Sequence, residues 1–400
     1  MKLGILTFHR PCNFGANLQA FATVRYFQSL GHEVKVIDYV READRNYQFV
    51  VASKQIEAHV EFIITRLPLT DQVSDEEGLR SVVRKEAFDA ILIGSDAVWR
   101  KPQDNNIYFA QWLFENPQLS SVPVASISPS HMGDGFQSCS KEQTDSIRKC
   151  LEQFKYVAVR DSWTRDVINR DIFGGDKYIQ NITPDPVFKL PKLLNDMEWD
   201  NRGHSSQKYI LATFEKDWSK SPKRGWLRRL WFNLFKKLAN KAGYELIELP
   251  IPEGKSGLSF DDCIDYPIDP IQWFLWIQNA RCFIGIRFHA IVSCIACGTP
   301  FYSIDSYCDN SFKNSLLTMF GFRKLARAND QRSKIRNLLF DTKFENYRTG
   351  DCIEFENPKR ILHQILECSK VDIQKLGDLC RVRFKSNMQD LIASICHETN

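Results

Sequence analysis

Apolar and polar positions alternate in blocks along the first forty residues and predict a βαβ unit. Residues 2–8 form an apolar run of strand length, residues 17–30 carry apolar side chains at helical spacing, and residues 33–39 return to a strand pattern. Gly31 lies between the last two blocks, where glycine commonly ends a helix. Such units build parallel sheets covered by helices. We therefore expect an α/β protein.

Three more short apolar runs follow, and each ends in polar residues that favour loops. They cover residues 90–93, 122–128 and 156–159. Gly94-Ser95-Asp96 follows the first run, and Arg160 follows the last. Ligands of open α/β sheets bind at the carboxyl ends of the strands. These strand ends are therefore the expected location of a binding site.

A second set of blocks begins after a polar, weakly periodic stretch. Strands are predicted at residues 209–214, 244–249 and 282–286, with helices over residues 226–242 and 271–279. A chain of 400 residues also exceeds the size at which one core usually stops growing. The sequence thus favours two α/β domains.

The expected boundaries follow from these blocks. Residues 1–182 form the N-terminal domain, 183–207 the linker, 208–350 the C-terminal domain and 351–400 a helical C-terminal segment.

Composition narrows the functional classes. The chain is 43% hydrophobic and 26% charged with a net charge of +4, which gives no strong argument for nucleic-acid binding. No secretory signal or transmembrane run is evident, and twelve cysteines are scattered without a disulfide pattern. We expect a cytoplasmic protein with no nucleic-acid partner.

Arg287 and His289 form the most informative pair in the chain. If they lie on a strand, both side chains share one face; if they open a helix, backbone N–H groups that favour an anion lie beside them. Either arrangement suits an anionic substrate that needs a proton. The competing interpretation is an exposed arginine beside a histidine with a structural role.

The loop before the first helix is a second candidate, because Gly15 permits close backbone approach and the helix N-terminus can bind an anion. Its competitor is a turn capped by Asn13. Ser95, Asp96 and Trp99 are candidates for the wall of a cleft, although Ser95 or Asp96 can instead cap a helix.

Arg160 follows four apolar residues and can project over the sheet edge to bind a carboxylate or phosphate. An ion pair with Asp161 or another surface acid is its alternative.

Taken in order, these segments resemble the polysaccharide pyruvyl transferase family over about residues 2–310. The motifs that carry the resemblance are residues 13–20, 37–39 and 93–96 with Trp99, then 125–126, 159–161, 185–186 and 287–290. The chain departs from the family pattern at Phe14, where tyrosine is common, at Ala97, where a polar residue is usual, and at Asp161, where glutamate is usual.

The resemblance implies a glycosyltransferase-B-like fold, with two Rossmann-like domains facing across a cleft. It also implies transfer of pyruvate from phosphoenolpyruvate to the hydroxyls of a cell-surface or exopolysaccharide glycan, with release of phosphate. No cofactor or metal is expected. The implied roles are His289 and Asp96 in catalysis, Arg160, Arg287, Asn13 and Gly15 in donor binding, and Ser95, Trp99 and Ser126 in the acceptor cleft.

Two other functions fit the same sequence. A nucleotide-sugar-dependent glycosyltransferase would share the architecture, since one fold hosts many chemistries. A non-catalytic anion- or glycan-binding module would keep the cleft and lack turnover.

Residues 220–241 carry eight basic residues, no acidic ones, and interleaved aromatic and aliphatic side chains. Such a helix can lie on an anionic membrane, which would suit a lipid-linked acceptor. Alternatively, it packs its apolar stripe on the sheet while the cations face water.

Overall fold

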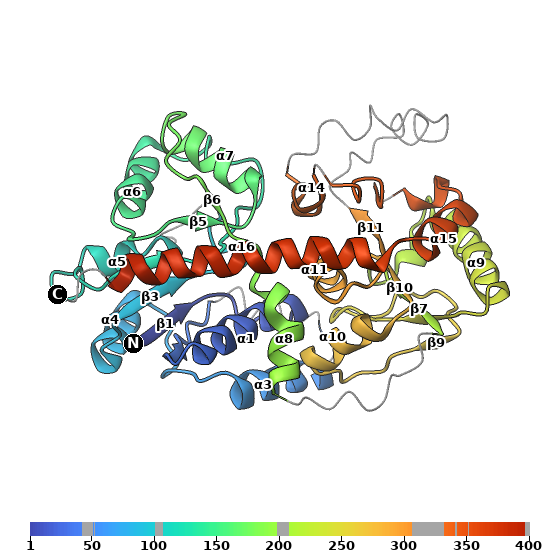
Figure 1. Ribbon diagram of the computed structural model, residues 1–400, viewed down its shortest axis with the longest axis horizontal. Coiled ribbons are helices and arrows are strands. Elements are labelled where there is room, and N and C mark those ends of the chain that lie inside the picture. Colours follow the sequence, from blue (N-terminus) through green and yellow to red (C-terminus); the bar gives the residue numbers. More distant parts are fainter. Residues whose placement is uncertain are drawn as a thin grey trace. The chain divides into compact units, whose positions relative to one another are not determined.

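The computed structural model describes residues 1–41, 51, 53–100, 107–197, 208–305, 332–340, 342–350 and 352–396. The chain divides into two compact units, each with its own parallel sheet. Unit 1 takes Met1–Phe49, His59–Leu194 and Leu379–Asn400, and unit 2 takes Val50–Ala58 and Asn195–Asp378. Both units have the predicted α/β architecture (Figure 1).

Unit 1 is built on a four-stranded parallel sheet in the order β2-β1-β3-β4. Strands β5 and β6 pair with each other, and a bridge from Ala125 to Tyr156 connects β4 to the chain just before β5. The strands are β1 (Lys2–Leu6), β2 (Glu33–Val36), β3 (Ala90–Ile93), β4 (Val124–Ser126), β5 (Ala158–Val159) and β6 (Asn181–Ile182). The helices are α1 (Phe14–Ser29), α3 (Ser53–Arg66), α4 (Glu76–Glu86), α5 (Gln111–Phe114), α6 (Lys141–Leu151), α7 (Ser162–Asp171) and α8 (Leu190–Asp196), of which α3 and α8 also contribute residues to unit 2.

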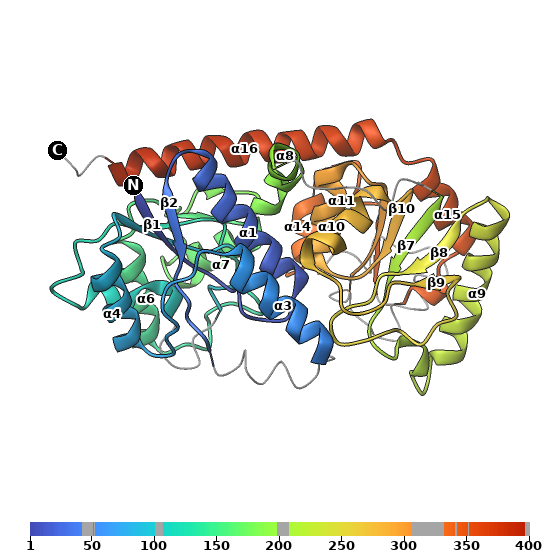
Figure 2. The ribbon, with the colours of Figure 1, turned by 90° about the horizontal axis from the view of Figure 1, so that it is seen from below.

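Unit 2 is built on a six-stranded parallel sheet in the order β12-β11-β10-β7-β8-β9. Figure 2 shows α9 and α15 on one side of this sheet and α10, α11 and α14 on the other. The strands are β7 (Tyr209–Thr213), β8 (Glu245–Glu248), β9 (Asp262–Cys263), β10 (Cys282–Gly285), β11 (Phe301–Asp305) and β12 (Arg348–Gly350). The helices are α9 (Gly225–Lys241), α10 (Pro270–Asn279), α11 (Phe288–Cys297), α14 (Lys334–Leu339), α15 (Pro358–Leu366) and the start of α16 (Lys370–Cys396).

Local signals explain why the first helix has these ends. The Asn13 side chain accepts hydrogen bonds from the N–H groups of Gly15 and Ala16 and so caps α1, which begins three residues before the predicted start. Gly31 has a φ of +84° just beyond the helix, and its N–H donates to the Gln28 carbonyl. The predicted glycine stop is thus confirmed.

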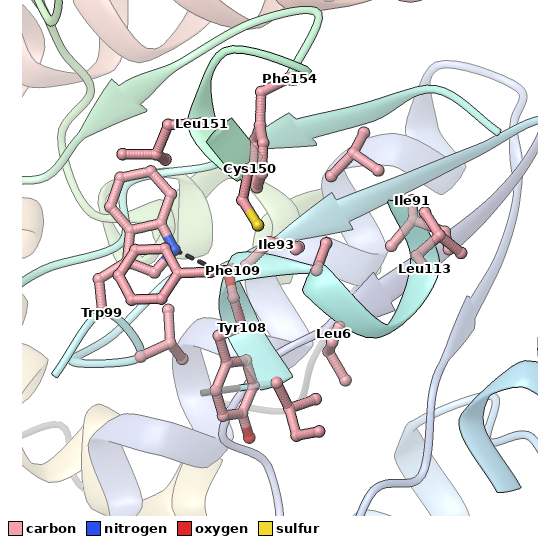
Figure 3. Close-up of a cluster of buried hydrophobic side chains, with 14 of the residues drawn as sticks. Leu6, Ile91, Ile93, Trp99, Tyr108, Phe109, Leu113, Cys150, Leu151 and Phe154 are labelled. Atoms are coloured by element: carbon pink, nitrogen blue, oxygen red, sulfur yellow. Dashed lines mark hydrogen bonds between the residues drawn. The ribbon is translucent and has the colours of Figure 1, made fainter. Parts of the chain in front are cut away.

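The hydrophobic core of unit 1 brings together residues that lie far apart in the sequence. Figure 3 shows Trp99 beside Phe109 and Ile91 beside Leu113, in one cluster that also includes Leu6. The Trp99 indole N–H donates to the Tyr108 carbonyl at 2.9 Å, so the polar atom of this fully buried ring has a partner.

The predicted linker and C-terminal segment need correction. Within residues 183–207, a short 3-10 helix (Pro186–Lys189) and most of α8 belong to unit 1, and residues 198–207 lie outside the described residues. The C-terminal segment is helical as predicted but does not form a separate part. Its last helix, α16, belongs to unit 2 up to Asp378 and to unit 1 from Leu379 onward. Within unit 1, the ring of Phe384 contacts that of Tyr26, and the Asn387 amide donates to Thr183.

Candidate functional site

The polar residues that follow the strands of unit 1 gather around one arginine. The Arg160 guanidinium donates to the Asp185 carboxylate at 2.9 Å, to the Ser130 hydroxyl at 2.6 Å and to the Asp96 carboxylate at 3.4 Å. These partners lie in the loops after β3 and β4 and in the segment after β6. We name these four residues the Arg160 cluster. It ties together the loops at the carboxyl edge of the sheet.

Charge and burial define the role of Arg160. Its side chain is only 2% exposed. Burial would lower the pKa of the guanidinium, but the carboxylates of Asp96, Asp185 and Asp161 outweigh burial and raise it. The cation is therefore permanently charged and paired inside the protein. Arg160 thus forms an ion pair, which was the alternative to donor binding. The pair is buried, however, and its acids are Asp185 and Asp96 instead of Asp161 or a surface acid.

The turn that carries Asp96 depends on a glycine. Gly94 has a φ of +108°, and a Cβ at this position would lie 2.3 Å from the carbonyl oxygen of Ile127. Only glycine allows the end of β3 to approach the loop after β4 so closely. Asp96 itself keeps 15% of its side chain exposed, so it is less buried than Arg160.

The three predicted acceptor residues are fully buried. Trp99 lies in the hydrophobic core, Ser95 donates to the Ser128 carbonyl, and Ser126 donates to the Ala158 carbonyl. A side chain without exposed surface does not touch a glycan in this conformation. These internal contacts give the three residues a structural role in unit 1 instead of the expected contact with the acceptor.

The loop before α1 forms a turn that is capped by Asn13. This was the alternative interpretation of the segment. The N–H of Gly15 donates to Asn13 Oδ1 at 3.0 Å, and that of Ala16 donates to the same atom at 3.3 Å. These donors are therefore already used within the chain, which removes the main argument for an anion at Asn13 and Gly15.

A buried group that sequence reasoning missed lies beside this loop. The carboxylate of Asp38, after β2, accepts hydrogen bonds from the His9 ring at 2.9 Å and from Arg10 Nε at 2.7 Å. Burial alone would raise the pKa of Asp38, but the bonds from His9 and Arg10 lower it from 3.8 to about 2. The resemblance had pointed to the 37–39 strand without assigning Asp38 a partner.

Replacement of Asp38 by asparagine should destabilise the protein by about 2–3 kcal/mol at pH 7, the linkage free energy of a pKa lowered by nearly two units. Since folding lowers this pKa, the stabilisation is complete above about pH 5 and is lost as the pH falls toward 2. Urea unfolding of both proteins at pH 7 and pH 3 measures the difference, which should shrink by about half. A pH-independent difference would show that ionisation of Asp38 is not the cause.

In unit 2, Arg287 and His289 lie where β10 gives way to helix α11. Arg287 is the N-cap residue, with a φ of 85°, and His289 lies in the first turn of the helix. The helix-opening alternative for this pair is therefore the correct one. The Arg287 side chain does not cap α11, and the first turn contains no acidic residue. A cation and the positive end of a helix dipole thus lie together.

Arg287 is held by a carboxylate but stays accessible. Its Nη2 donates to Glu253 Oε1 at 2.8 Å, and its side chain is 41% exposed. Glu253 lies in the loop after β8, so both residues belong to the carboxyl edge of the unit 2 sheet. Glu253 was missed, although the same strand-end rule points to it. One of the five N–H donors of the guanidinium is used in this bond, and the fork can offer the others to an anion.

The backbone before Arg287 is positioned by a close approach between two strands, β10 and β7. A Cβ on Gly285 would lie 2.3 Å from the carbonyl oxygen of Thr213 in the adjacent strand β7. Glycine therefore allows the end of β10 to lie against β7 as the chain turns into α11. His289 is half-buried in that first turn.

The family assignment rests on a match along most of the chain. The model of the polysaccharide pyruvyl transferase family matches residues 13–307. The chain belongs to this family. The match begins at Asn13 and includes the Arg160 cluster of unit 1 and the Arg287–His289 pair of unit 2. Among curated proteins, none matches this chain.

Solved structures show the fold of this family member. UDP-GlcNAc 2-epimerase from Methanocaldococcus jannaschii matches with a TM-score of 0.52 and 12% identity over 96% of this chain and 99% of that chain. The Neisseria meningitidis epimerase bound to UDP-GlcNAc matches with a TM-score of 0.51 and 11% identity over 100% of both chains. Arabidopsis thaliana UGT89C1 complexed with UDP-L-rhamnose matches with a TM-score of 0.52 and 11% identity over 99% of both chains. The predicted glycosyltransferase-B-like fold is confirmed.

Within the described ranges of this pyruvyl transferase family member, no group of three or more His, Cys, Asp or Glu side chains is arranged to hold a metal ion. No described helix is long and apolar enough to cross a bilayer. The candidate residues of both units lie at or just beyond the carboxyl ends of parallel strands.

Proposed function

We propose that this protein transfers the pyruvate unit of phosphoenolpyruvate to the hydroxyls of a glycan. The observation that carries the proposal is the position of the exposed Arg287 side chain at the N-cap of α11, two residues before His289 in the first turn, in a chain of the pyruvyl transferase family. Phosphoenolpyruvate presents a phosphate and a carboxylate in a small frame. Arg287 can bind one of these anions through several N–H donors, and the N-terminus of α11 favours negative charge beside it.

The reaction needs one proton donor at the start. His289 is proposed to protonate the enol methylene carbon, which becomes a methyl group and leaves C2 electron-poor. A glycan hydroxyl oxygen then bonds to C2, and the C2–O bond to phosphate breaks with its electron pair leaving on phosphate. A second hydroxyl bonds to C2 and completes a ketal. Of the two hydroxyl protons, one returns to His289 and the other leaves with phosphate.

The roles in unit 1 follow from burial. We propose that the partly exposed Asp96 orients an acceptor hydroxyl. Arg160, whose guanidinium is buried and paired, instead fixes the loop that carries Asp96. Donor binding is thus assigned to Arg287 rather than shared with Arg160, Asn13 and Gly15. We propose that the reaction takes place in the cytoplasm, which is the expectation from the sequence.

Arg287→Ala should weaken phosphoenolpyruvate binding by about 10- to 100-fold, because a hydrogen bond to a charged group contributes roughly 1.5–3 kcal/mol. Titration calorimetry with phosphoenolpyruvate alone measures this without an acceptor. Arg281→Ala is the matched control in the same unit, since Arg281 donates to the Leu366 carbonyl, away from the carboxyl end of β10. Equal affinities of wild type and Arg287→Ala would remove Arg287 from the donor site.

The main alternative is a nucleotide-sugar-dependent glycosyltransferase, since the solved relatives named above include proteins bound to UDP-sugars. At 11% identity, this likeness concerns the fold alone. Phosphate release from phosphoenolpyruvate is compared with UDP release from UDP-glucose and UDP-GlcNAc, using a panel of nitrophenyl hexosides as acceptors. Acceptor-dependent phosphate release supports pyruvyl transfer, whereas UDP release alone would overturn it.

A further inference from the structure

Helix α9 exposes a row of large apolar side chains that its packing does not explain. Trp226 and Leu230 are each 60% exposed, and Leu234 is 48% exposed. Residues four apart lie on one face of a helix, so these three side chains form a continuous ridge. We name this set the α9 ridge.

The ridge is distinct from the face that packs on unit 2. Trp231, Phe232, Phe235 and Ala239 are buried on the opposite face of α9. Trp231 donates its indole N–H to the Glu356 carbonyl, and the buried Arg228 guanidinium lies 4.5 Å from the centre of the Trp218 ring. Helix α9 therefore packs one apolar face on unit 2, as the alternative interpretation of this segment predicts. The described residues leave its second apolar face uncovered.

Cations surround the ridge. Lys237 and Lys241 are exposed and continue the same helix face beyond Leu234, while Lys223 is exposed just before the helix. The chain from 220 to 241 contains no acidic residue. Helix α15, which packs beside α9 (Figure 2), adds further cations and also has no acidic residue in its sequence PKRILHQIL.

This combination favours one class of occupant. We infer that the α9 ridge docks the protein on an anionic membrane surface. Trp and Leu side chains insert into the headgroup boundary, and the lysines beside them reach anionic lipid phosphates. A second copy of the chain fits less well, because a symmetric contact through the ridge would bring the lysines beside the two ridges together. Docking is independent of turnover and goes beyond the proposed reaction.

The test uses the full chain and vesicles of stated composition. Wild-type protein should co-sediment with vesicles made of equal parts phosphatidylcholine and phosphatidylglycerol, and binding should weaken as salt is added. It should not bind vesicles of phosphatidylcholine alone, because this surface carries no net charge. Failure to bind the anionic vesicles at low salt, or equal binding to both kinds, would overturn the proposal.

Two variants separate the apolar and charged contributions. Trp226→Gln/Leu230→Gln/Leu234→Gln should weaken binding by roughly 10²-fold. The exposed half of each of these large side chains supplies apolar contact with lipid, and glutamine removes that contact. Lys237→Gln/Lys241→Gln should weaken it by about five-fold per lysine. Glutamine is a good helix former, so α9 should persist in both, which circular dichroism and thermal unfolding check.

A matched control changes exposed apolar residues elsewhere. Ile64→Gln/Leu379→Gln/Val382→Gln alters three side chains that are 60%, 68% and 68% exposed on α3 and α16. This variant should bind anionic vesicles like wild type. Equal losses in the control and ridge variants would indicate nonspecific hydrophobic binding and contradict the assignment to α9. Sedimentation of a wild-type dimer that the ridge variant dissociates would assign the surface to self-association instead.

Discussion

Replacing His289 by alanine is expected to slow pyruvyl transfer from phosphoenolpyruvate by about 10²- to 10⁴-fold, the usual contribution of a general acid. The affinity for phosphoenolpyruvate should change little, because Arg287 and the N-terminus of α11 remain. The loss should therefore appear in kcat, measured by acceptor-dependent phosphate release. Folding is checked by thermal unfolding, since His289 is only half-buried.

The pH profile separates proton transfer from a structural role. The pH profile of wild-type kcat should contain a limb due to the proton donor, and the residual activity of His289→Ala should lack this limb. His363→Ala, at an exposed position on α15, is the matched control and should retain wild-type activity. A His289→Ala enzyme with near-wild-type kcat and pH profile would remove His289 from the mechanism.

Arg160→Met is expected to destabilise the protein by about 3–5 kcal/mol, because it leaves the carboxylates of Asp185 and Asp96 without their buried cation. The physical cause is desolvation: a buried carboxylate that loses its counter-charge cannot recover hydration. Urea unfolding at pH 7 measures the loss. Arg160→Lys should recover only part of it, since one ammonium cannot reproduce the planar fork that reaches Asp185 and Ser130.

A surface ion pair provides the control for Arg160. Arg165 pairs with Asp166 on α7, where both side chains are partly exposed, and Arg165→Ala should cost no more than about 1 kcal/mol. A double-mutant cycle of Arg160→Met with Asp185→Asn isolates the coupling between these two residues. Equal costs for Arg160→Met and Arg165→Ala, with no coupling, would show that the cluster does not hold the loops of unit 1.

The fold was predictable because its signals are local. Apolar runs bounded by glycine and polar residues placed β1, β3, β7 and β10 to within a few residues, and Gly31 marked the end of α1. The same reasoning located Arg287 and His289 at a strand end. Whether they lay on a strand or opened a helix was left undecided by periodicity, since two residues fit both patterns.

The partners of the candidate residues were not predictable, because they are distant in sequence. Asp96 lies 64 residues and Asp185 25 residues from Arg160, and no pattern in one sequence links them. Burial caused the other differences: Trp99 was expected in a cleft, but its ring completes the core beside Phe109. On α9, composition predicted an apolar stripe, yet only the structure separates the buried Trp231 from the exposed Trp226.

The central claim is tested most directly by following the carbon atoms of the donor. Wild-type protein is incubated with phosphoenolpyruvate labelled with an NMR-active carbon isotope at C2 and C3, together with glycan acceptors, and the products are examined by NMR and mass spectrometry. The account predicts a glycan that carries the labelled methyl and ketal carbons, formed in proportion to released phosphate and lost in His289→Ala. Labelled pyruvate released free in solution, or sugar transferred from UDP-glucose with no labelled glycan, would contradict it.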